Sequence, residues 1–170
     1  MKKMLALVLT LLCAPAVFAF DNEDSIVRWK NIVGVITIPG VDNPVGGIHA
    51  GATPWTVRSG HASVNLSTVA ASFEVEGLSI NGGNSTGTPG PISAVTGTLV
   101  CNAGAQTQVG IDTPAVPLNA HGEANFSGQL QGIPATCSNP LFLVRIASPA
   151  GAAGLWIATG TERFVGHDEK

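Results

Sequence analysis

Residues 60–80, GHASVNLSTVAASFEVEGLSI, decide the fold class of this chain. In the first half Ala62, Val64 and Leu66 alternate with polar residues, and in the second half Phe73 and Val75 do the same. A period of two residues is typical of a strand with one face on the core and one face in water. We therefore predict strands at 61–66 and 72–80, each with one wet face, as antiparallel sheets allow.

The same alternation recurs along the chain, and no window of eleven or more residues holds a helical period of 3.6. Clusters of Gly, Pro and Asn separate the apolar segments, as turns do. We predict the remaining strands at 32–38, 55–58, 95–101, 108–111, 124–131, 141–146 and 155–159. Short strands without a crossover helix predict an all-β fold, namely an antiparallel β-sandwich of about eight or nine strands, with a β-barrel as the alternative.

Two segments depart from simple alternation. Residues 141–146, LFLVRI, are apolar in both phases, which predicts a central strand covered on both sides. In residues 21–31 the acidic start suits the first turn of a helix, whereas residues 26–29, IVRW, alternate like an edge strand. For this segment we favour the strand.

The N-terminus has the pattern of a bacterial signal peptide. Lys2 and Lys3 precede an apolar run at 4–12, and small residues at 17–19 predict cleavage after Ala19. Acylation of Cys13 is the alternative, but the residue before it is Leu12 rather than a small one. We expect a signal peptide at 1–19, a single domain at 20–170, no transmembrane segment after cleavage, and a secreted or periplasmic location.

Composition excludes several classes of protein. The 170 residues carry a net charge of −3, with 11% charged and 45% hydrophobic residues. Cleavage removes two lysines, which leaves six Lys/Arg against eleven Asp/Glu and a net charge of −5. This balance argues against nucleic-acid binding through a basic surface, against a charge-rich disordered tail and against a coiled coil. So few cations also leave sheet edges poorly protected, and we expect self-association through edge strands.

Cleavage also leaves two cysteines, Cys101 and Cys137. Two cysteines in an exported protein predict a disulfide. A zinc site would need further ligands, and the chain has no CxxC or HxxxH spacing. We expect one disulfide, no metal and no cofactor.

No catalytic signature is present: the chain has no GxSxG, HExxH or SxxK motif and no free thiol beside a histidine. Glu74 and Glu76 lie two residues apart, which places their side chains on one strand face about 7 Å apart. We interpret them as a solvated face, and the alternative is an acid/base pair. If the protein is an enzyme, Arg58, His61, Glu74 and Glu76 are the set that could share one sheet face.

Tryptophan offers a second candidate for binding. Trp55 follows Pro54 at the end of a Gly-rich loop, so we select it as a candidate binding residue, whereas Trp156 lies in an apolar strand and is expected in the core. The chain has no Tyr, which is the usual aromatic of wet recognition sites, and this argues against a typical sugar-stacking platform.

Several segments resemble known sequences: 73–84 (FEVEGLSINGGN), 87–91 (GTPGP), 97–101 (GTLVC), 112–118 (DTPAVPL) and 126–128 (FSG). They resemble exported bacterial proteins of no assigned function, which implies a shared β-rich fold with the cysteine pair and transfers no activity. Separately, 60–66 through 73–78 resembles the first hairpin of chordin-type (CHRD) domains, over less than a fifth of the chain. The His-Ile-His segment of those domains does not follow.

Together these features predict an exported, non-enzymatic β-sandwich that acts through its surface as a binding, cell-envelope or matrix component. Its partner would be a protein or another surface, not nucleic acid. Two alternatives remain. One is a small-ligand carrier built as a β-barrel, and the other is a hydrolase-type enzyme with a site assembled from loops.

Overall fold

The computed structural model describes residues 25–38, 41–148 and 151–166. The elements are β1 (Ile26–Gly34), β2 (Trp55–Thr56), β3 (Ser59–Asn65), β4 (Ala70–Glu76), β5 (Ser79–Ile80), the 3₁₀ helix η2 (Gly83–Ser85), β6 (Ala94–Cys101), β7 (Val109–Asp112), β8 (Val116–Pro117), β9 (Ala124–Gln129), β10 (Leu141–Ala147) and β11 (Ala153–Val165). The predicted all-β, antiparallel class is confirmed. The expected signal peptide, Cys13 and His167 lie outside the described residues.

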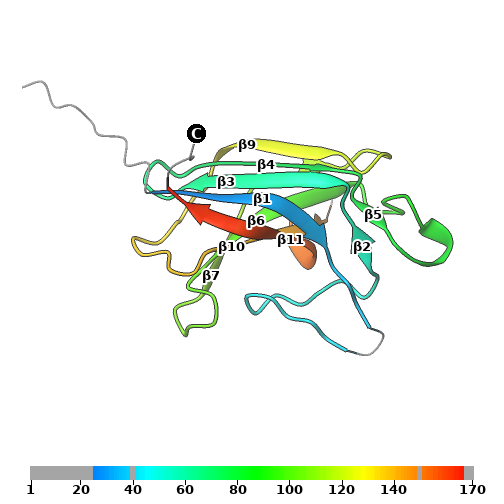
Figure 1. The fold of residues 1–170 in the computed structure, drawn as a ribbon, viewed down its shortest axis with the longest axis horizontal. Coiled ribbons are helices and arrows are strands. Elements are labelled where there is room, and N and C mark those ends of the chain that lie inside the picture. The colour runs from blue at the N-terminus through cyan, green and yellow to red at the C-terminus, as the bar shows by residue number, and fades with distance from the viewer. Residues whose placement is uncertain (1–24, 39–40, 149–150, 167–170) are drawn as a thin grey trace, which may run out of the picture.

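Nine of these strands form one antiparallel sheet in the order β7-β6-β10-β11-β1-β3-β4-β9, with β8 also paired to β6, and β2 and β5 form a small second sheet. The large sheet curls into a half-barrel, so that β1, β3, β4 and β9 lie over β6 and β10 (Figure 1). Phe73 on β4 and Phe142 on β10 are separated by three strands in this order, yet their ring centroids are 5.7 Å apart. The architecture therefore resembles a sandwich whose two layers belong to one sheet.

The concave side of the sheet holds the main core. Trp29, Phe73 and Phe142 are at most 2% exposed, and the Trp29 and Phe142 rings are 5.5 Å apart. Opposite them on β6 lies Gly97, where a Cβ atom would stand 2.8 Å from both phenylalanine rings. Close approach of the rings to the β6 backbone thus requires a glycine at this position.

A second, smaller core covers the convex side of β6, β10 and β11. The segment 41–54 lies there: Trp156 Nε1 donates to the Asn43 carbonyl at 3.0 Å, and the Gly51 N–H donates to the Trp156 carbonyl at 2.8 Å. Successive residues Leu143 and Val144 of β10 are consequently both fully buried. The prediction that 141–146 forms a central strand covered on both sides is confirmed.

The prediction of an edge strand near residue 26 is wrong in one respect. The segment is a strand, but β1 lies between β11 and β3. Its second neighbour is the thirteen-residue β11, of which alternation predicted only 155–159 because Gly160 and the polar residues 161–163 follow. Alternation in β1 also breaks where exposed Lys30 and Asn31 separate buried Trp29 from buried Ile32.

The predicted disulfide between Cys101 and Cys137 is present and joins the end of β6 to the loop that precedes β10. Hydrogen bonds reinforce this junction: the Asn102 N–H donates to the Ser138 carbonyl at 2.7 Å, and the Ser138 N–H donates to Asn102 Oδ1 at 2.9 Å. Among the described residues, no helix has the length and apolar character needed to cross a membrane.

Candidate functional site

Outward-pointing polar side chains cover the convex side of β1, β3, β4 and β9. Directly opposed residues of an antiparallel pair point to the same side of a sheet, so each row of partners shares one face. We call this surface the polar face and define it by Arg28, Lys30, Ser59, His61, Ser63, Ser72, Glu74, Glu76, Asn125 and Ser127. The inward neighbours of these residues along the strands, such as Trp29, Ala62 and Phe73, are buried.

One hollow of the polar face has a volume of ≈ 330 Å³. Its lining includes Arg58, His61, Glu74 and Glu76, so the structure brings together all four residues of the predicted set. The β3–β4 register causes this arrangement, because His61 lies opposite Glu74 and Ser59 lies opposite Glu76. Lys30 and Asn31 of β1 complete the rim.

Two carboxylates, Glu74 and Glu76, line this hollow, and the Glu76 side chain is the one with hydrogen-bond partners among the described residues. Its Oε2 accepts hydrogen bonds from Ser59 Oγ at 2.8 Å and from Arg58 Nη2 at 3.1 Å. The Ser59 hydrogen bond, followed by the hydrogen bond and charge of Arg58, lowers the pKa of Glu76 below its usual value. Within the part of the chain that the structure describes, the side chains of His61 and Glu74 form no hydrogen bond or ion pair.

The environment of Glu76 predicts a pH dependence of stability. Because the folded state lowers its pKa below the ordinary 4.5, ionised Glu76 stabilises the fold above that pH, and the contribution is lost as the pH falls through the lowered pKa. Urea unfolding should therefore show Glu76→Gln less stable than wild type at neutral pH, with a smaller difference at about pH 3. Glu74→Gln, on the same strand face, is the matched control and should show no such change. An equal deficit of Glu76→Gln at both pH values would contradict the assignment.

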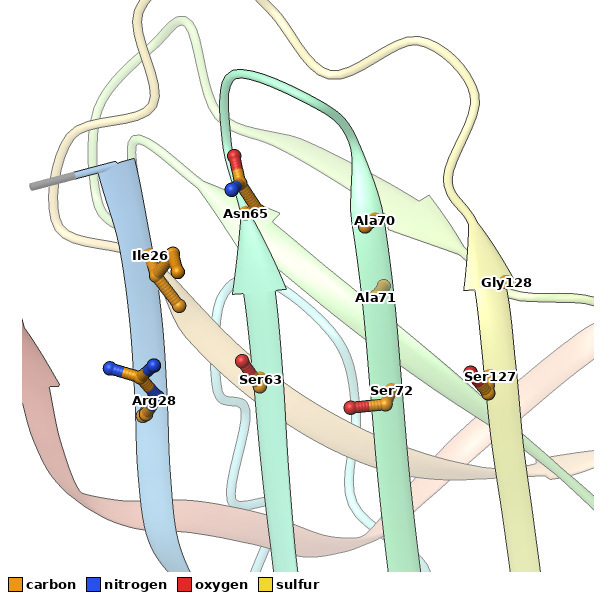
Figure 2. Close-up of a pocket in the computed structure, with 9 residues that line it drawn as sticks. All are labelled: Ile26, Arg28, Ser63, Asn65, Ala70, Ala71, Ser72, Ser127 and Gly128. Carbon is orange, nitrogen blue, oxygen red and sulfur yellow. The ribbon is translucent and has the colours of Figure 1, made fainter. Parts of the chain in front are cut away.

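A second hollow, of ≈ 290 Å³, adjoins the first on the polar face. Figure 2 shows Arg28, Ser63, Ser72 and Ser127 in one row across β1, β3, β4 and β9. Their register pairs are Arg28 with Ser63, Ser63 with Ser72, and Ser72 with Ser127. Between residues 25 and 166, gaps excepted, these four side chains make no hydrogen bond or ion pair. The row therefore presents one guanidinium and three hydroxyl groups to solvent.

An exposed aromatic ring borders the row. Phe164 of β11 lies opposite Arg28 and is 43% exposed. Lys30 Nζ stands 4.1 Å from the centroid of its ring, a cation–π contact that holds the ammonium group at the rim of the polar face. Sequence reasoning missed Arg28, Lys30 and Phe164. The alternation of 26–29 indicated a strand that contains Arg28, but nothing in the sequence paired that strand with 59–65.

The structure does not support Trp55 as a surface binding residue. Its side chain is 4% exposed. The Trp55 N–H donates to the Val35 carbonyl at 2.9 Å, and the strand β2 pairs with β5, so the end of the Gly-rich loop turns inward. This ring is therefore not available for stacking on a ligand. The expectation that Trp156 lies in the core is confirmed, at 3% exposure.

The other two histidines in the described residues, His49 and His121, do not join the polar face. His49 Nδ1 contacts Asp42 Oδ2 at 2.5 Å in the segment 41–54, and His121 lies in the turn before β9. No group of three or more His, Cys, Asp or Glu side chains that could hold a metal ion was found in the described ranges.

Comparison of the chain with protein-family models, with curated proteins and with solved structures found no match. The resemblances to exported bacterial proteins and to the first hairpin of chordin-type domains stay predictions.

Proposed function

We propose that this protein is an exported, non-enzymatic binding protein of the cell envelope or matrix, and that the polar face contacts its partner. The observation that carries the proposal is the row of Arg28, Ser63, Ser72 and Ser127. Backbone pairing fixes the spacing of this row across four strands, and its side chains have no partner among the described residues. The sheet therefore sets the spacing of these side chains before a ligand binds, and a site built on strands is more precise than a site built on loops.

The chemistry of the row favours a ligand with carboxylate and hydroxyl groups. A guanidinium group binds a carboxylate through two parallel hydrogen bonds, and serine hydroxyls both donate to and accept from sugar hydroxyls. An anionic polysaccharide presents both groups repeatedly along an extended chain. This mode of binding does not depend on aromatic stacking, so the absence of Tyr does not argue against it.

A hydrolase at this face is less well supported. The residue that holds the Ser59 hydroxyl is Glu76, whose pKa is lowered and whose Oε2 also accepts from Arg58. A carboxylate with a lowered pKa is a weak general base at neutral pH. The carrier alternative is also disfavoured, because the three rings of Trp29, Phe73 and Phe142 occupy the concave side where a ligand cavity would lie.

We expect Arg28→Gln to weaken binding of polygalacturonate, chosen as a carboxylated polysaccharide probe, by roughly tenfold to a hundredfold, as loss of a charged hydrogen bond does. Isothermal titration calorimetry measures the change. Gln106→Glu, in the exposed loop before β7, alters the net charge by the same amount away from the polar face and is the control. Retained affinity in Arg28→Gln, or an equal loss in the control, would refute the proposal. So would equal binding of neutral dextran.

A further inference from the structure

Strand β9 forms one end of the nine-stranded sheet, and within the described residues β4 is its only strand partner. The Leu130 N–H donates to the Val69 carbonyl at 2.9 Å. In an antiparallel pair, hydrogen-bonded positions alternate, so Phe126 and Gly128 direct their backbone groups to β4. The N–H and C=O groups of Asn125, Ser127 and Gln129 therefore point away from β4. Figure 1 shows β9 beside β4 at the margin of the sheet.

This edge carries few of the usual protections, although the Asn119 N–H donates to the Glu123 carbonyl at 3.1 Å and so places the chain after β8 beside the start of β9. Its six residues, ANFSGQ, include no charge and no proline, and their register with β4 runs without a bulge. Asn125, Ser127 and Gln129 are all exposed. The opposite edge, β7, is shorter, with four residues, and ends in Asp112. An uncharged edge without a bulge is a template for another strand.

We propose that a second copy of this chain pairs with β9, antiparallel and around a twofold axis at Ser127. In this register Ser127 lies opposite Ser127 of the second copy, and Asn125 lies opposite Gln129 of the second copy. Every outward backbone group of the three residues then has a partner, which gives about six new hydrogen bonds. Registers centred on Asn125 or Gln129 leave some of these groups unpaired.

Side-chain chemistry also suits a symmetric pair. The opposed residues are neutral, so no like charges face each other, and the Asn and Gln amides can hydrogen-bond across the junction. A twofold axis makes the contact closed, which limits the assembly to two chains. Pairing through one short strand buries a small area, so the dimer is weak and depends on concentration.

The consequence is a doubled polar face. Ser127 belongs to the row that starts at Arg28, so pairing at β9 makes this row continuous across both copies. An extended ligand could then contact two guanidinium groups at once. The dimer itself rests on the backbone edge and does not depend on the proposed ligand.

Sedimentation velocity over roughly a hundredfold range of concentration tests the proposal. Wild type should shift from monomer to dimer, whereas Ser127→Lys and Ser127→Glu, each alone, should raise the dissociation constant by about twofold to fivefold, because like charges oppose each other at the axis. Mixing the two variants should restore a dimer. Ser72→Lys, on the same face but one strand inward, is the control and should dimerise like wild type.

Three results would overturn the pairing: wild type that stays monomeric over the whole range, a Ser127→Lys variant that dimerises as well as wild type, or variants that do not associate when mixed. Circular dichroism of each variant confirms that the strand content is retained. Because this test uses no ligand, its outcome is separate from that of the polygalacturonate titration.

Discussion

Replacing Phe142 with alanine should lower the free energy of unfolding by about 3–5 kcal/mol. Phe142 is 2% exposed. Its ring centroid lies 5.5 Å from that of Trp29 on β1 and 5.7 Å from that of Phe73 on β4. It therefore joins the two layers of the curled sheet, and its removal leaves a cavity between them. Urea unfolding followed by tryptophan fluorescence measures the loss.

Phe164→Ala is the matched control for this substitution, because it also removes a phenylalanine ring, but from a residue of β11 that is 43% exposed. This variant loses the contact with Lys30, and its free energy of unfolding should fall by less than about 1 kcal/mol. A loss below about 2 kcal/mol in Phe142→Ala would mean that the core collapses around the gap, and that the two layers are not held by this ring.

Local patterns predicted most of the strands and placed one candidate set of residues on one sheet face. The predicted strand at 32–38 is wrong, because only its first three residues are in a strand and they form the end of β1. Alternation is a property of consecutive residues, so it correctly assigned inward Val64 and Phe73 and outward His61 and Glu74. The strands β3 and β4 are neighbours in sequence and pair directly. For that reason Arg58, His61, Glu74 and Glu76 could be expected on one sheet face, and the structure places all four around one hollow.

Contacts between distant segments could not be predicted in this way. The row at Arg28 depends on pairing of β1 with β3 and of β4 with β9, and the second pairing brings together Ser72 and Ser127, which are 55 residues apart (127 − 72). Trp55 was misjudged for a related reason. The Gly-rich segment before it has no periodic pattern, yet its backbone binds Trp156 of β11 and covers the convex side of that strand. The surface that such a segment covers depends on how the sheet curls, and the local sequence pattern does not determine this.

Removing the disulfide with Cys101→Ala and Cys137→Ala should lower stability by roughly 4 kcal/mol in the chain-entropy model, and the melting temperature by roughly 8–16 °C. The two cysteines are 36 residues apart in sequence, so the link restricts a long loop of the unfolded chain. In the folded state the same loop includes β7, β8 and β9, which separately pair with β6 and β4. Calorimetry of the double variant and of the reduced wild type should give similar losses.

Asn102→Gly separates the covalent contribution from the hydrogen bonds around it. This variant keeps the disulfide but loses the bonds from Asn102 Nδ2 to the Thr107 carbonyl at 3.2 Å and from the Ser138 N–H to Asn102 Oδ1 at 2.9 Å. Glycine suits the positive φ of 56° at this position, so backbone strain does not add to the cost. We expect the free energy of unfolding of this variant to fall by about 1 kcal/mol. If the double cysteine variant lost no more than Asn102→Gly, the noncovalent junction rather than the disulfide would hold the end of β6 to the loop before β10.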